Sequence, residues 1–281
     1  MLTRVLTGVV GIPIAVILVF WRVRDALPFT IAVAVFALLG TLEFYGVTRR
    51  KGARPVEWAG LAAVVLIIWA ARSEQLRGSG VLVPGVFTLL LVLSFAVELI
   101  RQNRSPVTNV GATLLGAAYV GWLFAHLILL RDMPGRLTVA GRASDAGAWL
   151  VMLVLASTWT CDTVAYFIGK HYGTRKLAPS LSPGKTVEGS VAGFVGALLM
   201  AVIVGTIIGL PAQHSLALGV IFGIAAQVGD LWESAVKRES GVKDSGRIIP
   251  GHGGVLDRFD ALLLTAPAAY YYAALLLGNW P

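Results

Sequence analysis

Acidic and basic side chains are concentrated in one stretch of this 281-residue chain, from Asp230 to Asp260. Asp230, Glu233 and Lys237 follow one another at spacings of three and four residues, which places them on one face of a helix. Asp257 and Asp260 lie three residues apart where a last apolar segment begins. Carboxylates at such helix ends, with lysines nearby, favour a hard divalent cation that carries phosphate oxygens. The alternative is a charged interfacial hairpin held together by ion pairs.

A long glycine-rich connection, Glu239–Leu256, joins these two groups of charged residues. Connections of this length inside a compact domain are more often functional than structural. Glycine lacks a Cβ atom, so backbone N–H groups there can approach an anion closely. We therefore expect this connection to bind phosphate oxygens. Its glycines are Gly241, Gly246, Gly251, Gly253 and Gly254.

The composition restricts the class of protein. Hydrophobic residues make up 57% of the chain and charged residues only 14%, whereas a soluble domain carries about a quarter charged residues. An ordinary soluble enzyme and a disordered chain are thereby excluded, and the lone Cys161 excludes an internal disulfide. With this apolar content, the net charge of +8 favours membrane lipids and cytoplasmic loops over a nucleic-acid partner. The sequence predicts an all-α, polytopic integral membrane protein.

Nine apolar segments are suited to cross the roughly 30 Å of hydrocarbon in a bilayer. The first could be a signal peptide, but no small-residue cleavage site follows it, so we expect a retained helix. The uncharged stretch Gly189–Gly229 is too long for one span and is predicted to break at Gly209–Pro211. A single membrane domain over 1–281 is expected, with N-terminal helices in 1–150 and catalytic helices and loops in 151–281. The predicted spans are Val5–Trp21, Leu27–Val47, Val56–Ala71, Gly80–Leu99, Asn109–Leu130, Gly147–Gly169, Gly189–Ile208, His214–Val236 and Phe259–Leu277.

Positive charges divide unevenly between the two sides of this nine-span arrangement. Sixteen of the 23 Lys and Arg residues fall on the side of the N-terminus and the even-numbered connections, and seven fall on the other side. The positive-inside rule then places the N-terminus in the cytoplasm and the C-terminus outside. We expect the protein in the cell inner membrane. Eleven of the 15 acidic residues share that side, so the active site is expected to face the cytoplasm. Eight or ten spans would scatter the charges more evenly.

Ser234–Asp260 carries a specific resemblance to a known family. It reads SAVKRESGVKDSGRIIPGHGGVLDRFD and resembles the signature of phosphatidate cytidylyltransferases, or CDP-diacylglycerol synthases, at every defined position. Two upstream stretches are similar to further segments of the family: Ser157–Gly173, and SPGKTVEGS from Ser182, where Gly184 and Val187 replace a commoner Lys and Trp. The resemblance covers roughly Ser157 to the C-terminus.

The resemblance implies an activity, a metal and a set of site residues. Family members transfer CMP from CTP to phosphatidic acid and produce CDP-diacylglycerol and pyrophosphate, with Mg²⁺ required. A monovalent cation such as K⁺ and a homodimer are further expectations. The implied metal ligands are Asp230 and Asp257, with Asp260 and Asp162 as neighbours. The implied catalytic residues are Asp230, Asp257, Lys237 and Lys185, and the implied substrate-binding residues are Arg238, Lys243, His252, Gly253, Gly254, Arg258 and Ser182.

Three acidic residues within the predicted spans receive two different interpretations, one for Asp162 and another for Glu43 and Glu98. Asp162 lies about two turns inside Lys170, at membrane depth, where a carboxylate is functional by default because its burial is costly. Glu43 and Glu98 lie near cytoplasmic helix ends, where a long side chain can reach water. Neither glutamate is therefore assigned any chemistry.

Two other activities remain open. A CTP-dependent lipid kinase would transfer the terminal phosphoryl group, but it is not expected to carry the complete signature. A cation-coupled membrane transporter would line its pathway with Asp162 and Asp230. Transporters tend to show repeated halves with broken helices, and the sequence has no visible repeat. Its charges also gather at one interface instead of being spread through the spans.

Overall fold

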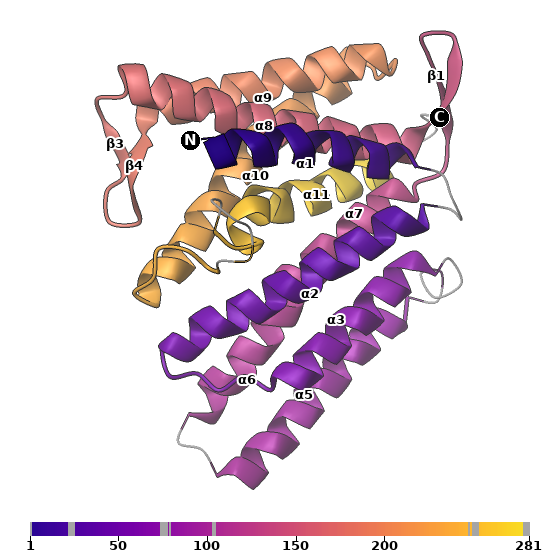
Figure 1. Ribbon diagram of the computed structural model, residues 1–281. Helices are drawn as coiled ribbons and strands as arrows, with labels where there is room; N and C mark the ends of the chain where they lie inside the picture. Colours follow the sequence, from indigo (N-terminus) through magenta and orange to yellow (C-terminus); the bar gives the residue numbers. More distant parts are fainter. Residues whose placement is uncertain are drawn as a thin grey trace. The chain divides into compact units, whose positions relative to one another are not determined.

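The chain forms long helices linked in two places by short β-hairpins (Figure 1). The computed structural model describes residues 2–21, 26–73, 78, 80–102, 105–246, 248 and 253–277, with side chains from residue 9 onward. These residues divide into two compact units. Unit 1 holds Met1–Leu129 and Val236–Phe259, and unit 2 holds Leu130–Ala235 and Asp260–Pro281. The single membrane domain expected from the sequence stays a prediction.

In unit 1, α2 packs against α3, and α3 packs in turn against α5 and η1. Apolar residues occur all around these helices, so each helix can bury one face and leave another for lipid. Phe44 and Ile67 are fully buried, whereas Ile31 and Leu89 are more than half exposed. The elements are α1 (Leu2–Phe20), α2 (Leu27–Arg50), α3 (Glu57–Arg72), α5 (Leu82–Arg101), α6 (Pro106–Leu115), the π-helix η1 (Gly116–Trp122) and α7 (Leu123–Arg131).

In unit 2, α8 and α9 pack closely against each other. Small residues permit this approach, because a Cβ added at Gly193 would lie 2.8 Å from the carbonyl oxygen of Cys161. A buried cluster of Cys161, Ala197, Ala226 and Ala261 joins these two helices to α10 and α11. The elements are β1 (Arg136–Val139), β2 (Arg142–Asp145), α8 (Ala146–Tyr172), β3 (Lys176–Ala178), β4 (Ser182–Thr186), α9 (Val187–Ile207), α10 (Ala212–Glu239) and α11 (Leu256–Leu276). The end of α10, from residue 236, and the first turn of α11, to residue 259, belong to unit 1.

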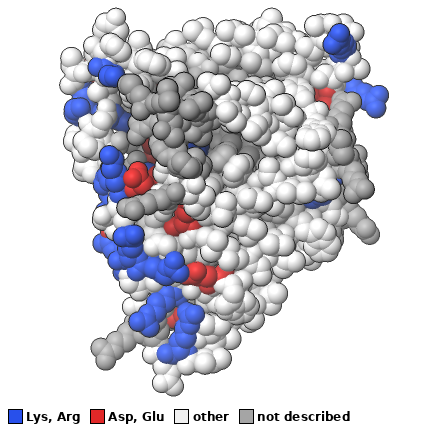
Figure 2. Space-filling model, in the orientation of Figure 1, with Lys and Arg blue, Asp and Glu red and all other residues white. Residues whose placement is uncertain are grey.

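Helices occupy all nine predicted spans. Among the described residues, seven helices are long and apolar enough to cross a membrane, and most of the visible surface is uncharged (Figure 2). The all-α, polytopic membrane architecture is thereby confirmed, while the count of nine spans and the cytoplasmic N-terminus stay predictions. The predicted break is also confirmed, since α9 ends at Ile207 and Gly209 has a φ of +71°. The antiparallel hairpins β1–β2 and β3–β4 were not expected.

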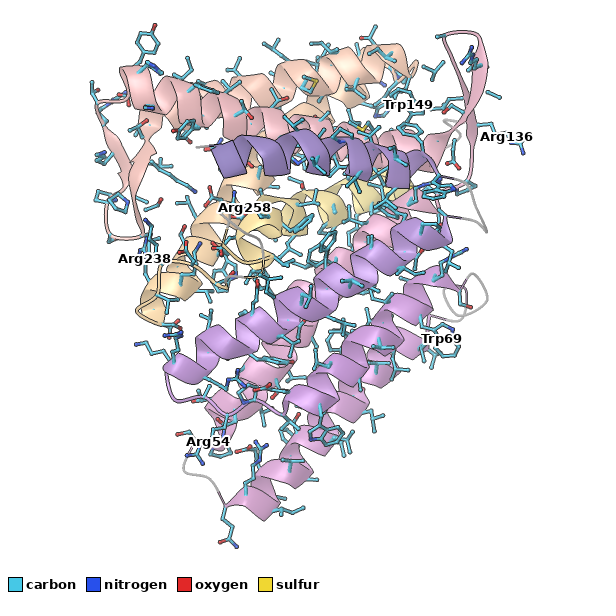
Figure 3. The ribbon with its side chains drawn as sticks, in the orientation of Figure 1. Arg54, Trp69, Arg136, Trp149, Arg238 and Arg258 are labelled. Carbon is cyan, nitrogen blue, oxygen red and sulfur yellow. The ribbon has the colours of Figure 1, made fainter. Side chains whose placement is uncertain are left out.

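A polar network fixes the end of unit 1 where the α2–α3 and α5–α6 connections meet. Glu98 is 4% exposed and accepts hydrogen bonds from Asn109 Nδ2 (2.7 Å) and Arg101 Nη1 (3.1 Å). Asn109 Oδ1 accepts from the backbone N–H of Arg54 (2.7 Å), and Arg101 donates to the carbonyl oxygen of Arg54 (2.9 Å). Figure 3 labels Arg54 at this end of α3 and Trp69 at the other. Two even-numbered connections thus lie at one end of the unit, as the nine-span arrangement requires.

Tyr45 lies at the centre of the packing between α2, α3 and η1. Its side chain is fully buried, and its hydroxyl donates to the carbonyl oxygen of Thr113 (2.8 Å). The neighbouring helices have glycine where they meet the ring, and a Cβ at Gly60 or Gly116 would overlap the Tyr45 side chain. Close helix approach in unit 1 therefore depends on these two glycines.

We expect Gly116→Ala to lower the stability of the protein by about 1–3 kcal/mol, because the added methyl group displaces a ring that is closed in on all sides. Gly111→Ala is the matched control: it lies on the same helical segment, and its added Cβ has no atom within 4 Å. Thermal unfolding in detergent should show a lower midpoint for Gly116→Ala alone. Equal midpoints for both variants would contradict this packing.

Candidate active site

Lys185 and Asp230 form an ion pair in unit 2, with Nζ 2.5 Å from Oδ2. Lys185 lies on β4 and Asp230 on α10. The end of the hairpin is fixed by Thr186, which is buried and caps α9 by accepting a hydrogen bond from the N–H of Gly189 (3.2 Å). The two charged side chains are 24% and 34% exposed. The hairpin therefore holds a lysine against a helix carboxylate while both remain accessible.

Two more of the predicted site residues also belong to unit 2. Asp162 is exposed on α8, next to the buried Cys161. Ser182 is the first residue of β4 and is half-buried. Ser182 thus lies on the same short strand as Lys185, and Asp162 lies on α8 of the same unit.

Close packing of α10 on α11 positions Asp260. A Cβ added at Gly229 would lie 2.5 Å from the carbonyl oxygen of Asp260 and 3.1 Å from the Cα atom of Ala261. Gly229 immediately precedes Asp230, so the backbone of Asp260 lies beside the turn of α10 that carries Asp230. The Asp260 carboxylate accepts a hydrogen bond from the N–H of Ala261 (2.7 Å).

Asp257 is the centre of a second cluster, which lies in unit 1. Its Oδ1 accepts from Lys237 Nζ (2.6 Å), and its Oδ2 accepts from Gly254 N–H (2.8 Å) and from the N–H and hydroxyl of Ser245 (both 2.9 Å). The Asp257 side chain is 4% exposed and that of Lys237 is 13% exposed. Asp257 therefore joins the end of α10, the following connection and the first turn of α11.

Glu43 belongs to the same cluster, which the sequence did not lead us to expect. This residue of α2 is 7% exposed, and it accepts hydrogen bonds from the backbone N–H groups of Val255 (3.0 Å) and Leu256 (2.9 Å) and from the hydroxyl of Ser245 (3.2 Å). We call Glu43, Lys237, Ser245, Gly254 and Asp257 the signature cluster. The costliness of a carboxylate at membrane depth, applied above to Asp162, would have identified Glu43 as well.

The signature cluster explains three glycines of the connection. A Cβ at Gly246 or Gly254 would overlap the carboxylate of Glu43. Gly253 has a φ of +83°, and a Cβ there would lie 2.7 Å from Asp257 Oδ2. The expected approach of backbone N–H groups to an anion is present at Gly254, where the anion is the protein's own Asp257. Substrate binding by Gly253 and Gly254 stays a prediction.

The remaining predicted cations lie at the surface of unit 1. Lys243 lines a polar hollow of about 580 Å³, together with Arg50 of α2 and with Asp244. Arg238 donates to the carbonyl oxygen of Val242 (3.0 Å). Both Arg238 and Arg258 are exposed, and Figure 3 labels them near the α10–α11 connection. His252, the last predicted substrate-binding residue, lies outside the described residues.

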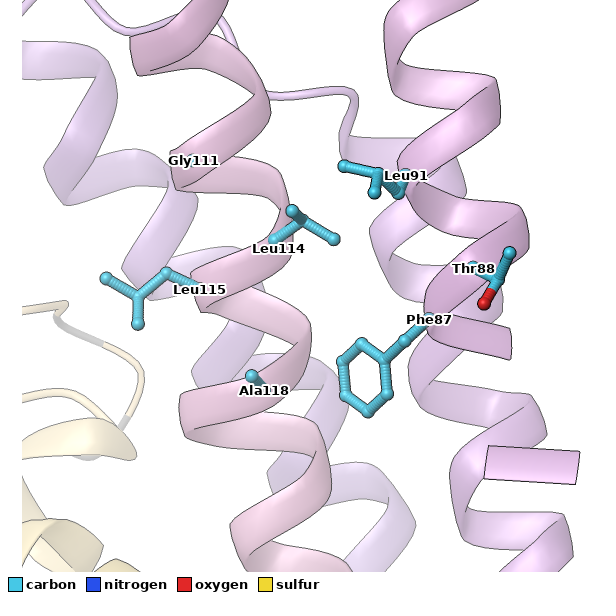
Figure 4. A pocket seen from close by; sticks show the side chains of 7 residues that line it. All are labelled: Phe87, Thr88, Leu91, Gly111, Leu114, Leu115 and Ala118. Atoms are coloured by element: carbon cyan, nitrogen blue, oxygen red, sulfur yellow. The ribbon is translucent and has the colours of Figure 1, made fainter. Parts of the chain in front are cut away.

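A separate apolar hollow lies between α5 and the α6–η1 segment of unit 1 (Figure 4). Its volume is about 640 Å³. Its lining has no ionisable side chain, so it offers nothing for phosphate chemistry, although its chemistry suits acyl chains. The lining residues are Phe87, Thr88, Leu91, Gly111, Leu114, Leu115 and Ala118.

The donor set fits magnesium better than a softer metal. The candidate ligands are aspartate oxygens, and Asp230 and Asp257 each face a lysine ammonium, so each site already accommodates positive charge. Among the described residues, no three His, Cys, Asp or Glu side chains form a metal site by themselves. Mg²⁺ commonly takes only one or two carboxylates and completes its coordination with substrate phosphates and water. Because Asp230 and Asp257 belong to different units, their joint role stays a prediction.

Comparison with known proteins gives matches over nearly the whole chain. The model of the family described as "Cytidylyltransferase family" matches residues 2–276. The phosphatidate cytidylyltransferase of Bacillus subtilis is 34% identical over 279 residues, covering 97% of each chain. That of Synechocystis is 32% identical over 98% of this chain and 97% of its own, and that of Brucella abortus is 32% identical over 97% and 93%. The match thus includes the N-terminal helices that showed no resemblance by motif, and the chain belongs to the cytidylyltransferase family.

Proposed function

We propose that this protein is a phosphatidate cytidylyltransferase, which transfers CMP from CTP to phosphatidic acid and releases pyrophosphate. The observation that carries this proposal is the full-length similarity to relatives of that name, at 32–34% identity over about 97% of the chain. The two carboxylate–lysine pairs support it, because they supply charged groups at the segments that resemble the family signature.

The proposed reaction needs positioning and charge more than it needs a strong base. A phosphate oxygen of phosphatidic acid attacks the α-phosphorus of CTP, and the bond from that phosphorus to the bridging oxygen breaks as pyrophosphate leaves. The lipid phosphate is already an anion and a competent nucleophile. Lys185 and Lys237 are proposed to turn from Asp230 and Asp257 toward phosphate oxygens, where positive charge stabilises the transition state. Arg238, Lys243, His252 and Arg258 are proposed to neutralise the remaining phosphate charge.

Asp230 and Asp257 are proposed to hold Mg²⁺ jointly, with Asp260 and Asp162 as neighbours. When bound, the ion would supply positive charge at the α-phosphate and at the leaving pyrophosphate. Two contacts between α10 and α11 support this proposal. Lys237 on α10 contacts Asp257 on α11, and Gly229 on α10 packs on Asp260 of α11. A monovalent cation such as K⁺ and a homodimer are additional proposals that rest on the family resemblance.

The reaction is proposed to take place at the cytoplasmic face of the cell inner membrane, where CTP is available. The distribution of Lys and Arg, 16 against seven, supports this orientation. Phosphatidic acid would reach the site from the surrounding lipid.

CTP labelled at the α- or γ-phosphate, supplied with phosphatidic acid to the purified protein, tests the activity. Label from the α position should enter the lipid fraction, and label from the γ position should appear in pyrophosphate. Lipid labelled from the γ position would instead identify a lipid kinase. No labelled lipid from either position would contradict both assignments.

Asp230→Asn and Asp257→Asn should each lower turnover at least ~100-fold at saturating magnesium, corresponding to about 2.7 kcal/mol. The double variant should lose little more, because both residues act through one ion. Asp145→Asn is the control, since Asp145 pairs with Arg131 and caps the start of α8, more than ten residues before Asp162; it should keep normal turnover per folded molecule. A single variant that retains more than about a tenth of wild-type turnover would contradict the shared metal site.

Cysteine labelling tests the proposed orientation in a Cys161→Ser background. Glu239→Cys, at the end of α10, should resist a membrane-impermeant thiol reagent in intact cells and react after the membrane is opened. Arg142→Cys, on β2, should react in intact cells, because the nine-span arrangement places that hairpin outside. The reverse pattern would show that the active site faces away from the cytoplasm.

A further inference from the structure

The end of α2 is an integral part of the signature cluster, although α2 lies far from the signature in sequence. Glu43 lies about two turns before the end of α2 and is 7% exposed. A buried carboxylate is costly unless donors or cations compensate it. Each hydrogen bond described for its side chain comes from the α10–α11 connection or from the start of α11: Ser245, Val255 and Leu256.

Two of these donors belong to the beginning of a helix. The first N–H groups of a helix have no partner within the helix and carry partial positive charge. Glu43 Oε1 accepts from the N–H of Val255 and Oε2 from that of Leu256, the first residue of α11. A carboxylate from one membrane helix therefore caps another helix, and it fixes where α11 begins.

The residue that follows this cap is Asp257, a proposed metal ligand. The Ser245 hydroxyl lies 3.2 Å from Glu43 Oε2 and 2.9 Å from Asp257 Oδ2. A hydroxyl has one proton and can donate to only one of the two carboxylates at a time. Glu43 and Asp257 thus lie on either side of one serine, and a shift of either carboxylate moves the contacts of the other.

The signature glycines fit the presence of Glu43. The carboxylate of Glu43 occupies the space that a Cβ would need at both Gly246 and Gly254. These glycines come from two parts of the connection that are eight residues apart, and one side chain from α2 meets both. The glycine pattern of the signature is therefore matched to a carboxylate that lies outside the signature.

We propose that Glu43 is a positioning residue of the transfer reaction, which holds the first turn of α11 and the connection so that Asp257 faces Lys237. This inference rests on the proposed function. Glu43 acts through the backbone of Val255 and Leu256 and through Ser245, and it is not proposed to touch CTP, lipid or metal. Its removal should lower the rate of transfer more than the binding of substrate.

Glu43→Gln tests this role in the full-length protein, because it keeps the shape of the side chain but places an NH₂ donor against a backbone donor. We expect kcat to fall about 10–100-fold, since a displacement near 1 Å can cost 100-fold, while KM for CTP changes less than about threefold. Glu43→Asp keeps the negative charge on a side chain that is one methylene group shorter, so its kcat should lie between those of wild type and Glu43→Gln. If the Glu43→Gln protein does not accumulate, Glu43→Asp provides the test: its kcat should fall below that of wild type, while KM for CTP changes less than about threefold.

Glu98→Gln is the matched control. Glu98 is also a carboxylate near a helix end of unit 1, at 4% exposed, but the hydrogen bonds described for its side chain come from Asn109 and Arg101. Its substitution should lower thermal stability and leave kcat within about threefold of wild type. Wild-type kcat in both Glu43 variants, or an equal loss in Glu98→Gln, would overturn the proposal. If wild type transfers no CMP to lipid, the proposed function fails instead.

Discussion

The burial of two carboxylates beneath one connection is the constraint on which the signature cluster depends. Glu43 comes from α2 and is 7% exposed, and Asp257 comes from α11 and has a side chain that is 4% exposed. Buried carboxylates are stable only where donors or cations surround them. The connection must therefore turn its N–H groups inward, and glycine is needed where the backbone passes the carboxylate oxygens. The conformation of the signature follows from this requirement.

Each of the two carboxylate–lysine pairs, one in each unit, suits a ligand rich in phosphate. Lys237 and Lys185 are each held by an aspartate, so neither ammonium is left uncompensated before the nucleotide arrives. Under the proposed function, substrate phosphates would compete for each lysine, and the released carboxylate would be open to the proposed metal ion. Charge at each pair would thus be rearranged, and little charge would have to be brought in from water, which suits catalysis by preorganised electrostatics.

The sequence predicted the membrane helices, but it predicted the two carboxylate–lysine pairs only in part. Hydropathy predicted the positions of the long apolar helices, because such helices must match the bilayer, and the signature singled out Lys237 and Asp257. Hydropathy does not report short hairpins, so β3–β4 and the placement of Lys185 against Asp230 were not foreseen. Glu43 was left without a role because a side chain near a helix end can reach water, although the cost of a carboxylate at membrane depth could have singled it out. Its partners could not be predicted, since they are backbone N–H groups more than 200 residues away.

Hydrogen exchange in a lipid nanodisc tests the central claim most directly, since it reports whether the buried carboxylates hold the connection. In the wild type, the amides of Ser245, Gly254, Val255 and Leu256 should exchange slowly, because each donates to Glu43 or Asp257. In Glu43→Gln, Val255 and Leu256 should exchange at least ~10-fold faster, while peptides from α3 keep their wild-type rates. Fast exchange of these amides in the wild type, or unchanged exchange in Glu43→Gln, would contradict the account.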